Sequence, residues 1–308
     1  MRAVPQPGVF ETAWQAVSAL DVAGVTADSR QVVPGDLFAA LPGSRSDGRA
    51  FIADAVERGA IAVLAPADTI WPPGVPPRPL ILDPEPRRRL AQIAAVLAGP
   101  QPDNVVAVTG TNGKTSTVEF LRQIWTASGL PAASLGTLGV IAPGFPPGPG
   151  LTTPDPVSLA EILAGLRRTG VRHAALEASS HGLDQSRLDG VRLTAAAFTN
   201  LTRDHLDYHA SLEAYCAAKL RLFAELLPQG APALASADMD AATLDALREV
   251  ARRRRLDLRT VGEAGDMIRL TRVTPRPDGQ VVAVEVGGVG RELMLALPGR
   301  FQADNALL

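Results

Sequence analysis

An apolar run, a glycine-containing turn and a helical pattern follow one another between residues 104 and 128, and this succession limits the possible folds more than any other part of the sequence. Residues 105–109 ("VVAVT") are apolar enough for a buried strand, and residues 114–128 have helical periodicity. Further strand-like runs and helical patterns alternate along the chain at 158–169, 173–179, 192–200 and 211–227. Such alternation is typical of a mainly parallel sheet covered by helices on both faces, so we expect an α/β fold.

Local signals refine this expectation. Ser158, with Glu161 three residues later, has the pattern of a capping box, which predicts that a helix starts at Ser158. Between 266 and 297 shorter apolar runs are separated by Pro and Gly, which predicts an antiparallel edge to the same sheet. The Pro-rich stretch 65–80 is predicted to be a loop.

The stretch "LAGPQPDN" (97–104) follows a helical pattern and precedes the apolar strand, which is typical of a domain boundary. We therefore expect an N-terminal α/β domain in residues 1–100 and a central domain in residues 101–308.

The composition excludes several classes of protein. With 308 residues, 46% hydrophobic residues and a formal charge of −2, the chain resembles an ordinary globular protein. Its basic residues are dispersed, and the one dense run, Arg252 to Arg255, is predicted to be a solvated helix end, so we expect no nucleic-acid binding. Cys216 is the only cysteine, which excludes an intramolecular disulfide and a thiolate zinc cluster. We expect a cytoplasmic protein without signal peptide or membrane insertion.

The turn "GTNGKT" (110–115) lies between the predicted strand and the predicted helix, which is the context that a phosphate-binding loop requires. Glycines let the backbone approach an anion, amide groups point inward, and the helix N-terminus adds positive potential. The general pattern would place its first glycine at Val108, so this loop is a shorter variant, and a plain turn before a helix is the alternative. The residues predicted to contact the nucleotide are Gly110, Thr111, Asn112, Gly113, Lys114, Thr115 and Ser116.

Lysine is almost absent from the chain, which contains 28 arginines and only Lys114 and Lys219. In the loop, Lys114 is expected to reach the β- and γ-phosphates, and the Thr115 hydroxyl is expected to hold Mg²⁺. Arginine is a poor substitute there because a planar fork does not replace a compact ammonium group.

Several motifs follow the loop in a fixed order, and together they resemble the Mur ligase family, in particular its MurE type. These motifs are "LTTPDP" (151–156), "EASSHGLDQSRL" (177–188), "FTNLTRDHLDYH" (198–209), "YCAAKLRLF" (215–223) and "GRFQADNALL" (299–308). Residues 26–65 are also similar to that family's UDP-binding domain.

The resemblance implies ATP-driven amide formation on UDP-N-acetylmuramoyl-L-alanyl-D-glutamate in peptidoglycan precursor synthesis. The D-glutamyl γ-carboxylate would attack the ATP γ-phosphate to give an acyl phosphate, and the amine of a diamino acid would then displace phosphate. Such chemistry relies on positioning and charge neutralisation, so Mg²⁺ is expected beside ATP. Meso-diaminopimelate is favoured over L-lysine as the added amino acid, because it is the commoner choice in this family, and a monomer is expected.

The resemblance also assigns catalytic and metal-binding residues. Glu177 would be a Mg²⁺ ligand, together with the Thr115 hydroxyl, and His205 would be the ligand of a second Mg²⁺. Lys219 would carry a carbamate that supports the metal, a modification that arginine cannot undergo because it stays protonated. Lys114, Glu177, His205 and Lys219 are thus the expected catalytic residues. Asp204 and Asp207 in the same motif are explained equally well by helix capping.

Six positions match those that grip the UDP-muramoyl-peptide in this family. Hydroxyls and an amide suit peptide and sugar groups, and a guanidinium suits a carboxylate or phosphate. The substrate-binding residues expected on this basis are Ser29, Thr152, Thr153, Ser179, Gln185 and Arg187.

Members of this family carry a third domain after the "GRFQADNALL" segment, and we expect that domain to be absent from this chain. The chain would then be part of a complete ligase. Two alternatives stay open at this stage: a two-domain module that binds UDP-muramoyl peptide and ATP without ligation, and an unrelated P-loop phosphotransferase.

Overall fold

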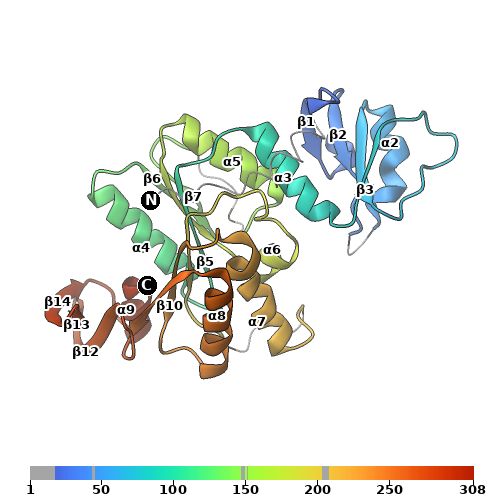
Figure 1. The fold of residues 1–308 in the computed structure, drawn as a ribbon. Coiled ribbons are helices and arrows are strands. Elements are labelled where there is room, and N and C mark those ends of the chain that lie inside the picture. The colour runs from blue at the N-terminus through green and yellow to red at the C-terminus, as the bar shows by residue number, and fades with distance from the viewer. Residues whose placement is uncertain (1–17, 44–45, 147–149, 151, 203–207) are drawn as a thin grey trace.

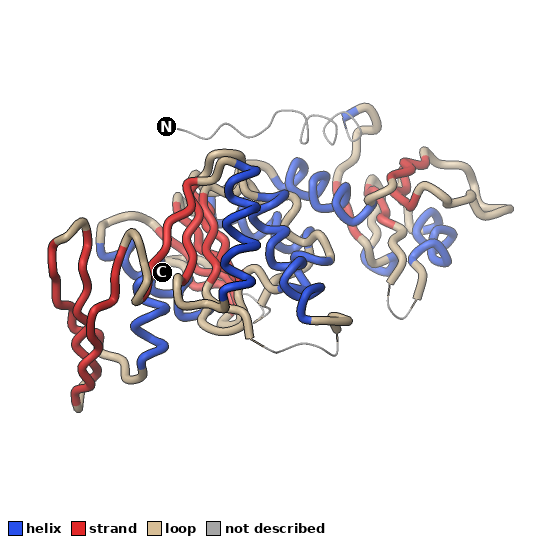
Figure 2. The backbone as a smooth tube through the Cα atoms, turned by 60° about the horizontal axis from the view of Figure 1, so that its bottom comes forward, coloured by secondary structure: helices blue, strands red, loops and turns tan. Residues whose placement is uncertain are grey.

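The computed structural model of the chain describes residues 18–43, 46–146, 150, 152–202 and 208–308. The described residues form two sheets. The N-terminal sheet lies at one end, the larger sheet lies in the middle, and the antiparallel strands β12–β14 that extend the larger sheet lie at the other end (Figure 1). Figure 2 shows the same succession from a second direction.

The N-terminal sheet has four parallel strands in the described residues, in the order β1-β2-β3-β4. One face, with Phe38 and Val63, packs under α2; the other, with Leu37 and Leu64, packs under α3. The elements are β1 (Gly24–Thr26), η1 (Ser29–Gln31), β2 (Asp36–Ala39), η2 (Gly48–Phe51), α2 (Ile52–Glu57), β3 (Ala62–Pro66), β4 (Leu80–Asp83) and α3 (Pro86–Ala98). Most of the loop predicted at 65–80 connects β3 and β4, but its first two residues belong to β3 and its last begins β4.

Helix α3 joins the two sheets. Its buried residues Leu90 and Ile93 share one hydrophobic cluster with Leu37 of the N-terminal sheet and with Ala160 of α5 (Pro156–Arg168). The two halves are therefore in contact through packed helices, and the domain boundary near residue 100 stays a prediction.

The larger sheet contains ten strands within the described residues, in the order β14-β13-β12-β11-β10-β9-β5-β8-β6-β7. Strands from β12 to β6 are parallel, whereas β7, β13 and β14 are antiparallel to their neighbours. The prediction of a mainly parallel sheet with an antiparallel edge at 266–297 is therefore confirmed. The strands are β5 (Asn104–Thr109), β6 (Ala132–Gly136), β7 (Gly139–Ile141), β8 (His173–Glu177), β9 (Ala195–Phe198), β10 (Pro232–Ser236), β11 (Asp257–Gly262), β12 (Ile268–Arg276), β13 (Gly279–Val286) and β14 (Val289–Leu295).

Both faces of the parallel strands are covered because successive side chains point to opposite faces. In β5, Val105 and Ala107 join the cluster beneath α5, α7 and α8, whereas Val108 joins the cluster beneath α4. The remaining helices are α4 (Lys114–Ala127), α6 (Ser180–Asp184), α7 (Leu212–Arg221), η3 (Leu222–Leu226, a π-helical turn), α8 (Ala241–Arg254) and α9 (Arg300–Leu307).

The capping-box prediction for Ser158 is wrong. Helix α5 begins at Pro156, and its N-cap is Asp155, whose carboxylate accepts from the backbone N–H groups of Val157 and Ser158. Proline is favoured in the first helical turn because its missing N–H would have no partner there, and this moves the start two residues upstream. The Arg252 to Arg255 run does end a helix, α8, and is largely exposed.

Candidate functional site

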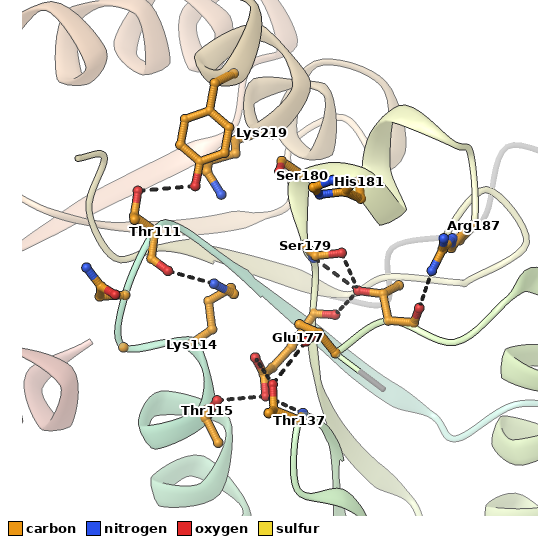
Figure 3. Close-up of a pocket in the computed structure, with 15 residues that line it drawn as sticks. Thr111, Lys114, Thr115, Thr137, Glu177, Ser179, Ser180, His181, Arg187 and Lys219 are labelled. Atoms are coloured by element: carbon orange, nitrogen blue, oxygen red, sulfur yellow. Dashed lines mark hydrogen bonds between the residues drawn. The ribbon is translucent and has the colours of Figure 1, made fainter. Parts of the chain in front are cut away.

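The carboxyl ends of β5, β8 and β9 meet at one edge of the larger sheet. Strand β5 lies between β8 and β9: the chain leaves β5 toward β6 on one side and later crosses from β8 to β9 on the other. In open α/β sheets this is where ligands bind. The turn after β5 and Glu177 at the end of β8 both lie at this edge (Figure 3).

The turn 110–113 requires glycine at both ends. Gly110 and Gly113 have φ angles of 142° and 87°, which side-chain-bearing residues rarely adopt. A Cβ on Gly110 would lie 1.8 Å from the Thr199 hydroxyl, and one on Gly113 would lie 2.1 Å from Asn305 Oδ1. Helix α4 starts directly after Gly113, so its N-terminus points into the turn.

Lys114 folds back over this turn. Its ammonium group donates to the carbonyl oxygens of Gly110 (3.0 Å) and Thr111 (2.8 Å). The positive charge and the helix N-terminus thus face the same concave backbone, which is the arrangement that attracts a phosphate group.

Residues 199–202, which follow β9, make hydrogen bonds to the turn 110–113. The Thr199 hydroxyl donates to the Asn112 carbonyl (2.6 Å), and the Asn112 N–H donates to Asn200 Oδ1 (3.0 Å). The Thr202 N–H donates to the Thr111 hydroxyl (2.9 Å). The motif that begins at Phe198 therefore contacts the turn directly; His205, Asp204 and Asp207 lie outside the described residues.

Glu177 connects the turn to the rest of the site. Its side chain is 2% exposed, and Oε1 accepts from the Thr115 hydroxyl (2.9 Å) and from the Thr137 N–H (2.8 Å). The carboxylate approaches this closely because residue 136 is glycine, where a Cβ would lie 2.0 Å from Oε1.

On the far side of Glu177 lie the predicted substrate residues. The Thr153 hydroxyl donates to the Glu177 carbonyl (2.9 Å), and the Ser179 hydroxyl caps α6 by accepting from the Gly182 N–H. Arg187 donates to the Thr153 carbonyl (2.7 Å) and through Nη2 to Gln185 Oε1 (2.7 Å). Burial lowers the pKa of Arg187 from its usual value, so an anion beside it would be bound in a partly desolvated place.

Lys219 reaches the same site from α7. Its side chain is 1% exposed, its ammonium group donates to the Gly110 carbonyl (2.7 Å), and it lies 4.3 Å from the centre of the Tyr215 ring. A buried lysine in contact with the phosphate-loop backbone is not a surface cation.

These residues surround one cavity of about 460 Å³. Among the predicted residues, those that line it are Thr111, Asn112, Gly113, Lys114, Thr115, Thr152, Thr153, Glu177, Ser179, Arg187 and Lys219. Gln185, which accepts from Arg187, does not line the cavity, and neither do Gly110, the first residue of the turn, and Ser116, in the first turn of α4. Ser29 lies in η1, between β1 and β2 of the N-terminal sheet, and does not line this cavity.

Four cavity-lining residues carry no role in the sequence analysis: Thr137, Ser180, His181 and Tyr215. Ser180, His181 and Tyr215 lie inside the quoted motifs, so position alone could have suggested them. Thr137 lies in the turn between β6 and β7, and no motif indicated it.

A larger cavity of about 1480 Å³ lies at the opposite edge of the sheet, at the starts of β5, β8, β9 and β10. Its arginines include Arg167 and Arg254, which stand in the last turns of α5 and α8. Cations at helix C-termini neutralise the exposed carbonyl ends, so these charges have a structural explanation.

The donor atoms around Glu177 suit a hard cation. A threonine hydroxyl (Thr115) and a carboxylate (Glu177) are oxygen ligands of the kind that Mg²⁺ prefers. No cluster of three or more His, Cys, Asp or Glu side chains suited to a metal occurs in the part of the chain that the structure describes. Substrate phosphates and water could supply further ligands to a Mg²⁺ held here, beside the predicted His205 and Lys219 carbamate.

Two family descriptions match the chain: "Mur ligase middle domain" over residues 108–308 and "Mur ligase family, catalytic domain" over residues 21–98. The chain belongs to the Mur ligase family. The family membership that the motifs indicated is therefore confirmed. The alternative of an unrelated P-loop phosphotransferase is not supported.

Curated relatives within the Mur ligases are similar over most of the chain. The UDP-N-acetylmuramoyl-L-alanyl-D-glutamate–2,6-diaminopimelate ligase of Rhizobium meliloti (strain 1021) is 53% identical over 289 residues, which are 94% of this chain and 58% of that protein. The enzyme of the same name from Caulobacter vibrioides is 53% identical over 293 residues, 93% of this chain and 59% of its own length. The chain thus spans about 58% of the length of such relatives.

Solved structures of Mur ligases share the fold. A UDP-N-acetylmuramoyl-L-alanyl-D-glutamate–2,6-diaminopimelate ligase superposes with a TM-score of 0.80 at 29% identity, over 92% of this chain and 58% of that chain. The MurF ligase from Thermotoga maritima, solved with ADP, superposes with a TM-score of 0.60 at 20% identity, over 94% and 62% of the two chains. In the described part of this chain, no helix is long and apolar enough to cross a membrane.

Proposed function

We propose that the chain acts in the ATP-dependent ligation of a diamino acid to UDP-N-acetylmuramoyl-L-alanyl-D-glutamate during peptidoglycan precursor synthesis. Meso-diaminopimelate is favoured over L-lysine because relatives 53% identical to this chain are named as diaminopimelate ligases. The protein would work as a cytoplasmic monomer, with UDP bound by residues 1–100 around Ser29 and ATP bound by residues 101–308.

One observation carries this proposal: the phosphate loop and the predicted acceptor residues share one cavity, with Glu177 between them. Glu177 contacts Thr115 of the loop through its side chain and Thr153 through its backbone carbonyl. An acceptor carboxylate held on this side would therefore face a γ-phosphate held by Lys114, as acyl phosphate formation requires.

Within the cavity each group has a separate task. Lys114 and the backbone N–H groups of the turn would hold the phosphates of ATP, and Arg187 would orient an anionic part of the acceptor. Thr115 and Glu177 would hold one magnesium ion and His205 a second, and magnesium when bound neutralises phosphate charge. Lys219, as a carbamate, would add support for magnesium at this site.

Thermal shift measurements test this proposal. We expect UDP-N-acetylmuramoyl-L-alanyl-D-glutamate to raise the melting temperature more than UDP alone, and MgATP to raise it further. Arg187→Ala should reduce the response to the peptide-bearing ligand while leaving the response to UDP, and Lys114→Ala should remove the response to MgATP alone. Equal stabilisation by UDP and by the peptide-bearing ligand would contradict the assignment of the acceptor site.

A further inference from the structure

Thr137 lies at the tip of the hairpin between β6 and β7 and faces the cavity (Figure 3). Its backbone N–H donates to Glu177 Oε1 at 2.8 Å. Its hydroxyl lies between two partners: Glu177 Oε2 at 3.4 Å and the Thr152 hydroxyl at 3.1 Å. The residue thus contacts both the carboxylate and a threonine on the acceptor side.

The direction of these hydrogen bonds follows from the chemistry of the groups. An ionised carboxylate only accepts, so the Thr137 hydroxyl uses its single hydrogen for Glu177. The hydrogen between the two threonines must then come from Thr152. The result is a directed chain, from the Thr152 hydroxyl to the Thr137 hydroxyl to Glu177 Oε2.

A second chain reaches the same residue by its backbone. The Thr153 hydroxyl donates to the Glu177 carbonyl, so the hydrogen between Thr153 and Ser179 comes from Ser179. The Thr153 oxygen already accepts from the Ser179 hydroxyl and the Ser179 N–H, so lone pairs for a ligand remain on Thr152 and Ser179. An N–H or O–H group of a substrate can bind these lone pairs without breaking either chain.

We propose that Thr137 is a positioning residue that couples the acceptor-binding threonine Thr152 to the Glu177 carboxylate. This inference rests on the proposed function and adds a residue to it. The 3.4 Å contact is long for an O–H···O bond, and such bonds commonly tighten when substrates bind. Acceptor bound at Thr152 would shorten the chain and fix the carboxylate in one orientation.

The test compares four proteins: the wild type, Thr137→Val, Thr137→Ser and Thr126→Val. Valine keeps the shape of threonine without the hydroxyl, and serine restores the hydroxyl. Thr126 is the matched control, because its hydroxyl bonds only the preceding turn of α4, at Arg122, on an exposed face. Melting temperatures establish that each variant is folded.

Two binding readouts separate positioning from general damage. Mn²⁺ binding in the presence of ATP reports on Glu177. It is measured from the electron spin resonance signal of the Mn²⁺ that stays unbound. Calorimetry with UDP-N-acetylmuramoyl-L-alanyl-D-glutamate reports on the acceptor side. We expect Thr137→Val to weaken both about 10-fold, since a hydrogen bond to a charged group is lost, and Thr137→Ser to restore both. Thr126→Val should match the wild type.

The inference is overturned if folded Thr137→Val binds Mn²⁺ and acceptor like the wild type, or if Thr137→Ser is as defective as Thr137→Val. Those outcomes leave the proposed function intact. A wild-type chain that binds neither MnATP nor the acceptor would instead overturn the proposed function, and the inference with it.

Discussion

Lys114 and Lys219, the only two lysines of the chain, donate hydrogen bonds to the same acceptor, the carbonyl oxygen of Gly110. They come from α4 and α7, which are far apart in sequence. Two compact ammonium groups fit around one carbonyl of a tight turn, whereas a planar guanidinium would need more room and more partners. This contact favours lysine over arginine at both positions, and at Lys219 it describes the unmodified amine that would take up the carbamate.

The first prediction concerns Lys219. Lys219→Arg should lower the ligation rate by at least about 100-fold. Arginine cannot form a carbamate, so the substitution places a fixed positive charge where the site would hold a negative one. The rate of ADP release in the presence of both substrates measures this, and circular dichroism checks the fold. A fully active Lys219→Arg variant would refute the carbamate role.

Chemical rescue separates the roles of the two lysines. Added short carboxylic acids should partly restore the activity of Lys219→Ala, because a free carboxylate can replace the carbamate. The same acids should leave Lys114→Ala inactive, since a lost ammonium group cannot be replaced by an anion. Rescue of both variants, or of neither, would argue against this division of roles.

The second prediction concerns the turn. Gly113→Ala should lower the free energy of unfolding by more than about 2 kcal/mol, because φ is +87° and the new Cβ would lie 2.1 Å from Asn305 Oδ1. Gly129→Ala is the matched control: φ is +77° there, but nothing lies within 4 Å of the Cβ. It should lose only about 1 kcal/mol. Urea denaturation compares the two, and equal losses would mean that Asn305 does not restrict the turn.

The third prediction is a pH dependence. Glu119 of α4 accepts hydrogen bonds from Arg122, Gln123 and Ser134, and these partners, Arg122 above all, lower its pKa from 4.5 to about 2. A lowered carboxyl pKa stabilises the fold above the unfolded pKa, and this stabilisation is lost as the pH falls from about 4.5 to 2.

Glu119→Gln should therefore be less stable than the wild type by about 1–2 kcal/mol near pH 7, allowing for partial solvent screening. This difference in unfolding free energy between the wild type and Glu119→Gln should become smaller as the pH falls toward 2. Glu249→Gln, which removes an exposed partner of Arg252, should change stability by less than about 0.5 kcal/mol at any pH. A gap between wild type and Glu119→Gln that does not depend on pH would contradict the role of its charge.

The fourth prediction concerns Asp189, a buried carboxylate whose side chain is 1% exposed. It pairs with Arg221 at the end of α7 and with Arg88 of α3. Asp189→Asn should cost about 3 kcal/mol of unfolding free energy, since it leaves two arginines without their buried counter-charge. Asp245→Asn, in an exposed pair with Arg248, should cost less than about 0.5 kcal/mol. Similar effects of the two substitutions on denaturant midpoints would contradict this reading of the network.

How far the sequence predicts the site depends on how local each signal is. The strand before Gly110 and the helix from Lys114 follow from apolar periodicity and glycine placement, which act over a few residues. The hairpin that carries Thr137 was not predicted. Its sequence, "AASLGTLGVI" (132–141), has no regular alternation, and β6 is a strand because it pairs with β8, which is distant in the chain.

The role of Thr199 and Asn200 was missed for a related reason. They hold the phosphate loop because β9 lies beside β5, and adjacency of strands is a property of the sheet order. The start of α5 shows the opposite case, in which a local signal at Asp155 and Pro156 outweighed the expected cap at Ser158. The proposed roles of Ser29 and His205 stay predictions.

Ligation by the gene product that carries this sequence tests the central claim most directly. ATP, Mg²⁺ and UDP-N-acetylmuramoyl-L-alanyl-D-glutamate are supplied with either meso-diaminopimelate or L-lysine, and ADP and the tripeptide product are quantified together. We predict one ADP per tripeptide formed, with meso-diaminopimelate used in preference to L-lysine. ADP release that needs no muramoyl-dipeptide, or no tripeptide with either amino acid, would contradict the proposed function.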